Sequence, residues 1–164
     1  MPVDATEYAT AFRAHAAAVW LLTLQDGIDD VGTTVTSVVS ASARPPLVGV
    51  GLAADGYPAE LLAEVRRCGL TALRAEHAIV ASRFASAGRP SARHLLESVP
   101  WQRTGGGAIV LGEGLVALDC RLDRLVPAGD HVLALLEVDA VPVLDPAGDP
   151  LLRFRGRFAG VAER

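Results

Sequence analysis

The sequence predicts a mainly β protein with peripheral helices, in which antiparallel strands form a barrel. Three observations support this fold class. A length of 164 residues suits one domain, spanning residues 1–164, and a hydrophobic fraction of 51% is enough for a buried core. Segments of β character occur both in the first third of the chain and after residue 108. The expected elements also lack the regular strand–helix–strand alternation of a doubly wound sheet.

The first third of the chain is expected to hold one helix and three strands. Residues 4–18 are alanine-rich, with apolar side chains at helical spacing, and predict a helix. Residues 19–24 form a short β-rich run that stops at a Gln-Asp-Gly turn. Residues 31–42 are dense in β-branched and hydroxyl side chains and predict one strand, ended by two prolines. Residues 47–52 predict a buried strand.

The middle third is expected to be largely helical. Residues 59–67 predict a helix, because Pro58 suits a first helical position and the arginines at 66 and 67 suit a helix C-terminus. The other elements expected here are a strand over 69–73, a helix over 76–87 that stops at Gly88, and a short helix over 91–98.

The last third returns to β structure. We expect a loop at 105–107, strands over 115–122 and 131–143 with a turn at 127–130 between them, and a closing strand over 151–158. On that closing strand Arg155 and Arg157 would share one face. These two arginines are either solvated charges or contacts for a pyrophosphate.

The composition excludes several classes of function. A net charge of −4 without a basic run argues against a nucleic-acid surface. All 15 basic residues are arginine, so a Schiff-base or phosphate-loop lysine is excluded. Cys68 and Cys120 lie 52 positions apart in apolar runs, which favours core packing in a reduced, cytoplasmic protein. No apolar run reaches ~18 residues, and the N-terminus lacks a basic leader, so we expect neither a membrane span nor export.

Common catalytic motifs are not found. Gly49 and Gly51 lie within a strand and lack the third glycine of a dinucleotide-binding turn. No nucleophile elbow, zinc-protease motif or phosphate loop occurs. The histidines at 15, 77, 94 and 131 are scattered, so no metal site is expected. A pair of carboxylates for glycoside hydrolysis is not specified by any pattern.

The hydroxyl-rich run over residues 33–40 has two interpretations. Threonine favours strands, so alternate hydroxyls would simply face water. Alternatively, hydroxyls and main-chain N–H groups at the edge between a strand and a loop bind a phosphate. Composition alone does not choose between these interpretations.

A family resemblance favours the second interpretation. The segment GTTVTSVVSAS at 32–42, followed by Pro45, Pro46 and Leu47, resembles a stretch found in flavin reductase-like proteins with the FMN-binding split-barrel fold. Further segments are similar to that family in the same order along the chain, at 15–23, 75–85, 118–121, 128–131, 137–138 and 149–158.

The resemblance implies an antiparallel split β-barrel and an NAD(P)H:flavin oxidoreductase. Its cofactors would be FMN or FAD, with NADH or NADPH as the hydride donor, and the flavin would lie at a homodimer interface. The reduced flavin would pass to a separate flavin-dependent monooxygenase. The two cofactors perform this chemistry themselves, so the lack of a nucleophile or metal motif agrees with it.

The resemblance also implies a set of site residues. His131 would lie where the nicotinamide docks, either orienting it or supplying a proton, or else act as a turn residue. The implied flavin-binding residues are Thr34, Val35, Thr36, Ser37, Ser40, Ala53, Asp55, Gly56, Pro58, Ser82, Arg83 and Phe84.

The chain departs from the family pattern near the implied phosphate site. Thr36 stands where an asparagine is common, and Gly56-Tyr57-Pro58 replaces a hydroxyl-rich loop. Because each neutral hydrogen bond contributes about 1 kcal/mol, these losses should weaken flavin binding. Weak binding suits a reductase that releases its flavin. The alternatives are a redox protein that retains flavin and a non-catalytic dimeric barrel that has lost it.

Overall fold

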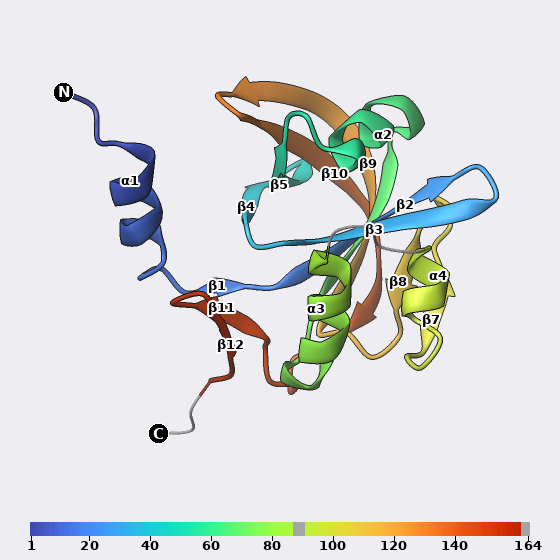
Figure 1. The fold of residues 1–164 in the computed structure, drawn as a ribbon. Coiled ribbons are helices and arrows are strands. Elements are labelled where there is room, and N and C mark those ends of the chain that lie inside the picture. The colour runs from blue at the N-terminus through green and yellow to red at the C-terminus, as the bar shows by residue number, and fades with distance from the viewer. Residues whose placement is uncertain (87–90, 162–164) are drawn as a thin grey trace.

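The computed structural model describes residues 1–86 and 91–161 and has a large antiparallel sheet at its centre (Figure 1). Seven strands pair in the order β3-β2-β6-β9-β10-β5-β4, and every pairing is antiparallel. Their bounds are β2 (Trp20–Asp26), β3 (Asp29–Val35), β4 (Val38–Ala43), β5 (Pro46–Ala53), β6 (Arg67–Ala72), β9 (Val116–Ala128) and β10 (His131–Leu144). The predicted mainly β, antiparallel class is confirmed.

The two edges of this sheet are joined by a very short connection. β3 and β4 stand at opposite ends of the strand order, yet only Thr36 and Ser37 lie between them in the chain. Two linking residues span roughly 10 Å at most, so the sheet has to curl until its edges approach. The Gly51 N–H of β5 donates to the Ser37 carbonyl oxygen at 2.9 Å, which fixes the connection against the next strand.

In the described part of the chain, five helical segments and five shorter strands surround the sheet. The helices are α1 (Ala5–Phe12), α2 (Tyr57–Val65), the 3-10 turn η1 (Ala75–His77), α3 (Ala78–Ala85) and α4 (Ala92–Leu95). One small sheet contains β1 (Ala17–Ala18), β11 (Leu152–Phe154) and β12 (Arg157–Ala159), and a second contains β7 (Trp101–Arg103) and β8 (Ile109–Leu111). Figure 1 shows α1 standing apart from the large sheet, beside the β1–β11–β12 sheet.

Two hydrophobic clusters lie on opposite faces of β2. Leu22 belongs to the cluster enclosed by the curled sheet and α2, together with Leu62 and Leu136. Leu21 belongs to the second cluster, which packs α3, α4 and β8 against the sheet around Phe84. Successive side chains of a strand point to opposite faces, so β2 is buried on both sides.

The predicted N-terminal helix is too long. It begins after Asp4, whose carboxylate accepts hydrogen bonds from the Thr6 and Glu7 N–H groups, and it ends at Phe12 instead of residue 18. Ala17 and Ala18 form β1 and pair with Arg153 and Leu152. The pairing across strands overrides the helix propensity of these alanines.

Two predicted single strands are in fact pairs of strands. The segment 31–42 breaks at Thr36 and Ser37, so it contains the end of β3 and most of β4. The segment 151–158 is a β11–β12 hairpin, with Arg155 and Gly156 in its turn at positive φ values of 49° and 76°. Arg155 therefore does not share a strand face with Arg157.

The helix predicted over 59–67 is shifted towards the N-terminus, and the helices predicted over 76–87 and 91–98 are shorter than expected. α2 ends at Val65, because Arg66 adopts a left-handed conformation and Arg67 begins β6. α3 ends at Ala85, and the predicted stop at Gly88 lies outside the described residues. The short helix predicted over 91–98 is a single turn.

The two cysteines face each other across the sheet. Cys68 of β6 lies in register with Cys120 of β9, and both are fully buried free thiols. The hydrogen bond to Cys120 and burial together raise the pKa of the Cys68 thiol well above its usual value. The Cys68 thiol therefore stays protonated, and the full burial of both side chains agrees with the predicted core packing.

Candidate functional site

A pocket of about 300 Å³ forms where the connection between β3 and β4 meets β5, α2 and β10. Its lining is rich in hydroxyl groups and main-chain atoms and consists of Thr33, Thr34, Val35, Thr36, Ser37, Gly51, Leu52, Ala53, Gly56, Pro58, Ala59 and His131. These residues come from segments far apart in sequence, and the curl of the sheet brings them together.

Gly51 allows the β3–β4 connection to lie directly on β5. A Cβ atom at position 51 would lie 3.0 Å from the Ser37 Cβ, closer than nearly all contacts of that kind. A larger residue would push Ser37 away from its hydrogen bond with the Gly51 N–H. The Thr36–Ser37 hydroxyls thus depend on a glycine for their position in the pocket.

The N-terminus of α2 points its positive end at the pocket. The N-cap residue is Gly56, which offers no side-chain acceptor to the first turn, and Pro58 is within that turn. Helix N-termini carry partial positive charge and unpaired N–H groups, which bind anions. Tyr57 anchors this end, because its hydroxyl donates to Asp26 Oδ2 at 2.6 Å and the pKa of Tyr57 is raised by that hydrogen bond.

His131 lies at the pocket's other side, at the start of β10. It pairs in register with Ala53, and the Ala54 N–H donates to the Asp130 carbonyl oxygen at 3.0 Å. The His131 Nδ1 lies 2.7 Å from Asp130 Oδ1. This hydrogen bond and the charge of the imidazole hold the pKa of the Asp130 carboxyl below its usual range. The His131 side chain is about half exposed, so a ligand can reach it.

A larger groove of about 980 Å³ adjoins the pocket and shares Thr36, Ser37 and Gly51 with it. On the far side the groove is bounded by the end of α1 and by the β11–β12 hairpin. The lining residues on that side include Arg13, His15, Ala17, Arg153, Arg155 and Gly156. The pocket and the groove are therefore neighbours, with these three shared residues between them.

The structure brings together most of the site residues expected from the sequence. Thr34, Val35, Thr36, Ser37, Ala53, Gly56, Pro58 and His131 all line the pocket. The Val35 side chain is itself buried in the core, so Val35 offers the pocket its main chain. Ser40 is an exposed residue of β4 paired with Val48, and Asp55 is exposed in the turn before α2; neither lines the pocket.

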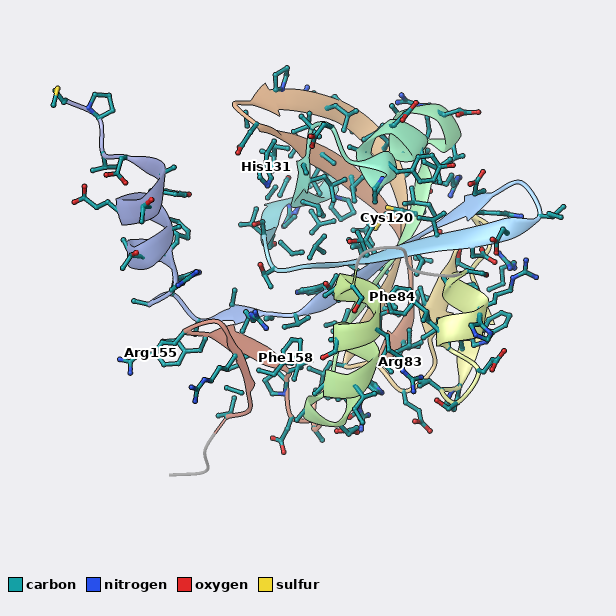
Figure 2. All side chains as sticks on the ribbon, viewed as in Figure 1. Arg83, Phe84, Cys120, His131, Arg155 and Phe158 are labelled. Carbon is teal, nitrogen blue, oxygen red and sulfur yellow. The ribbon has the colours of Figure 1, made fainter. Side chains whose placement is uncertain are left out.

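The three residues expected from α3 lie elsewhere. Ser82 and Arg83 line a separate surface depression together with Ile79. Figure 2 shows Arg83 and His131 well apart in the molecule. Phe84 is fully buried in the second hydrophobic cluster and lines neither the pocket nor the groove, so its expected contact with a ligand stays a prediction. The ring instead packs against Gly32, where a Cβ atom would lie 2.4 Å from Phe84 Cε1.

Several lining residues were missed by sequence reasoning. Thr33 belongs to the hydroxyl-rich run but is not among the residues that the resemblance implies, and the Gly-Val-Gly segment of Gly51 indicated only a strand. Arg13 and Arg153 have no local signal, because they meet at the groove only through the pairing of β1 with β11.

The chemistry of the pocket fits a phosphate ester. Hydroxyl donors and an uncapped helix N-terminus are the groups that bind phosphate oxygens. Within residues 1–86 and 91–161, no cluster of three or more His, Cys, Asp or Glu side chains is placed to hold a metal ion. In the same part of the chain, no helix has the length and hydropathy to cross a membrane.

Comparisons with known proteins agree over nearly the whole chain. A family model described as flavin reductase like domain matches residues 12–162. The chain is 31% identical over 153 residues to the NADH-dependent FMN reductase AsuE2 of Streptomyces nodosus subsp. asukaensis, covering 93% of this chain and 83% of the relative. It is 33% identical over 153 residues to an NADPH-flavin oxidoreductase of Streptomyces viridifaciens, covering 93% and 78%. The structure of BorF, the flavin reductase component of a bacterial two-component tryptophan halogenase, is similar with a TM-score of 0.88 at 26% identity, covering 98% of this chain and all of that one.

Proposed function

Because this chain belongs to the flavin reductase like family, we propose that it is an NAD(P)H:flavin oxidoreductase that reduces FMN or FAD. The observation that carries the proposal is the hydroxyl-lined pocket at the N-terminus of α2. It offers neutral donors and a helix dipole to a phosphate and places His131 on the opposite side. As the chain has no motif for covalent or metal catalysis, binding and orientation are the tasks left to it.

The residues divide these tasks between them. Thr36 and Ser37, with the first turn of α2, bind the flavin phosphate. His131 orients the nicotinamide or supplies a proton to the reduced flavin from its exposed imidazole. When bound, the nicotinamide and the flavin supply the hydride donor and the hydride acceptor. Asp130 keeps the His131 ring in one orientation through the 2.7 Å hydrogen bond to Nδ1.

The functional unit is a homodimer. α1 has eight residues and none of them is buried, although Tyr8 and Phe12 stack at 4.8 Å and are each more than half exposed. Isolated helices this short are marginal in water. A second copy of the chain covering the aromatic face of α1 would explain why this short, exposed helix is stable.

The reduced flavin is released to a separate flavin-dependent monooxygenase. Gly56 and Pro58 replace hydroxyl donors at the pocket, so the flavin is held loosely enough to leave after each turnover. A reductase that serves a separate flavin-dependent enzyme has a precedent in BorF, which is the flavin reductase component of a two-component tryptophan halogenase. The buried free thiols of Cys68 and Cys120 support a cytoplasmic location. Cysteines on neighbouring strands stay reduced, without forming a disulfide, in a reducing compartment.

The test is an initial-rate assay of NADH and NADPH oxidation by purified protein with FMN, FAD or no added flavin. Oxidation that requires added flavin and saturates with it supports a reductase that treats flavin as a substrate. A yellow protein that keeps its flavin through gel filtration supports the flavin-retaining alternative. A folded dimer without oxidation or flavin binding would overturn the enzyme proposal in favour of a binding scaffold.

A further inference from the structure

The large groove carries a concentration of positive charge that the flavin pocket does not explain. Its lining includes Arg13, Arg153, Arg155 and His15 and contains no Asp or Glu among the described residues. The protein as a whole has a net charge of −4, so this local excess of cations is opposite in sign to the molecule. Such an arrangement attracts an anionic ligand.

The backbone holds two of these arginines at the same place. The Arg155 N–H donates to the Arg13 carbonyl oxygen at 2.9 Å, which ties the β11–β12 turn to the end of α1. Arg155 has a φ of 49°, a left-handed conformation that costs a non-glycine residue free energy. An arginine at this turn position needs a reason beyond the turn itself, because glycine or asparagine would form the turn more readily.

The side chains of the hairpin arginines are oriented by aromatic rings. The Arg153 guanidinium lies 5.1 Å from the centre of the Phe158 ring, and the Arg155 guanidinium lies 4.9 Å from the centre of the Phe154 ring. These contacts limit the freedom of two long side chains without neutralising their charge. Within the described ranges, no carboxylate forms an ion pair with Arg13, Arg153 or Arg155. Their donors thus remain available to a ligand.

The position of the groove indicates which anion it binds. Hydride transfer requires the nicotinamide to lie against the flavin, beside the pocket that His131 lines. The rest of a dinucleotide then has to extend into adjoining space, and the groove shares Thr36, Ser37 and Gly51 with that pocket. Arginine is the side chain best suited to phosphate oxygens, since its planar guanidinium donates two parallel hydrogen bonds.

We infer that Arg13, Arg153 and Arg155 bind the phosphate groups of the nicotinamide dinucleotide, and this inference rests on the proposed reductase function. They are binding residues and take no part in hydride transfer. The flavin phosphate, by contrast, is bound at the first turn of α2. The two anions therefore occupy different cavities, on either side of the lining residues that the pocket and the groove share.

The test is the double variant Arg153→Gln/Arg155→Gln, with Arg157→Gln as the matched control. Arg157 belongs to the same hairpin but does not line the groove. We expect the double variant to raise the KM for NADH and NADPH at least about tenfold, because both dinucleotides lose the charge-assisted hydrogen bonds of their phosphates to Arg153 and Arg155. The KM for FMN should stay the same, and the control should match the wild type in both. Calorimetric titration of FMN-saturated protein with NAD⁺ and NADP⁺ should show the same loss of affinity.

Other outcomes separate the inference from the function on which it rests. A normal KM and Kd for both dinucleotides in the double variant would overturn the inference and leave the reductase function standing. A raised KM for FMN, or for FAD alone, would assign the arginines to the flavin and would also overturn it. Wild-type protein that binds NADP⁺ but reduces no flavin would contradict the proposed function instead. Circular dichroism and the melting temperature of each variant identify any loss of folding.

Discussion

The Asp30 carboxylate receives two parallel hydrogen bonds from the Arg103 guanidinium, each 3.0 Å long. Asp30 is 1% exposed and also lies 3.1 Å from the Nε of Arg93. The carboxylate therefore links the β2–β3 hairpin to α4 and to β7. It holds these peripheral elements over the second hydrophobic cluster.

Removing this carboxylate should destabilise the protein. We expect Asp30→Ala to lower the free energy of unfolding by about 2–3 kcal/mol, because it removes the paired hydrogen bonds from Arg103 and the contact with Arg93. Urea unfolding followed by circular dichroism measures the change. Glu137→Ala breaks the exposed pair with Arg121 and should cost less than about 1 kcal/mol. Equal losses for the two variants would contradict the role assigned to Asp30.

Gly32 is required by the Phe84 ring. Gly32→Ala places a methyl group 2.4 Å from Phe84 Cε1, inside a fully packed cluster, and overpacking of this kind costs about 1–3 kcal/mol. Thermal unfolding should show the loss. The double variant Gly32→Ala/Phe84→Leu should recover part of it, since the smaller side chain leaves room for the methyl group. No recovery would indicate that the backbone at Gly32, and not the ring, is the constraint.

The hydroxyl groups of the pocket should govern flavin affinity. We expect Thr34→Val/Ser37→Ala to raise the KM for FMN about thirtyfold, since two neutral hydrogen bonds of about 1 kcal/mol each are lost. The melting temperature should change little. Ser42→Ala, a change in the same hydroxyl-rich segment but outside the pocket, serves as the control. Unchanged flavin saturation in the double variant would move the phosphate site elsewhere.

The titration of Asp130 should depend on His131. In the wild type the imidazole stabilises the carboxylate, so Asp130 releases its proton below its usual pKa. His131→Asn removes that partner, and the pKa of Asp130 should rise towards 3.8. The contact with His131 stabilises the folded state fully above the usual pKa of the carboxyl. This stabilisation is lost as the pH falls through the lowered pKa of Asp130 in the folded protein. Carboxyl-carbon NMR over pH 2–6 measures the titration of Asp130 in the wild type and in the variant. Identical curves would show that the 2.7 Å contact is absent in solution.

The aromatic face of α1 should control the oligomeric state. Tyr8→Ser/Phe12→Ser removes the exposed aromatic pair and leaves the rest of the fold in place, because neither side chain is buried in the single chain. We expect light scattering to detect a shift from dimer to monomer at low protein concentration. Ile28→Ser, which changes an even more exposed apolar residue in the β2–β3 turn, should leave the dimer intact. A double variant that dimerises like the wild type would place the interface elsewhere.

Local patterns in the sequence predict much of the fold. The strands around residues 19–24, 47–52 and 131–143 are confirmed, since their apolar residues and the glycine turn before His131 are local signals. The break at Thr36 and Ser37 is not predictable in this way, because both residues suit a strand and the break arises from the curling of the sheet. β1 escapes prediction for the same reason, as Ala17 and Ala18 become a strand only through β11.

The candidate site likewise combines residues with a local sequence signal and residues that only the fold brings together. The hydroxyl run and the glycine before α2 are visible in the sequence, and the structure gathers them with His131 in one pocket. Phe84 and Arg83 are neighbours in sequence, yet one is buried in the core and the other faces solvent. The groove arginines come from opposite ends of the chain, so their meeting depends on the pairing of β1 with β11.

The two-residue connection between β3 and β4 couples ligand binding to the stability of the adjoining sheet edges. Thr36 and Ser37 form the covalent link between the sheet edges, and they are also the donors that we propose for the flavin phosphate. A ligand bound there raises the free energy of unfolding by mass action. We expect the increase to be largest for local opening where the two sheet edges meet. Amide protons of β4 should therefore exchange more slowly as flavin is added, while those of the centrally placed β6 stay the same. Flavin would thus act as a folding cofactor for one edge of the sheet as well as a substrate.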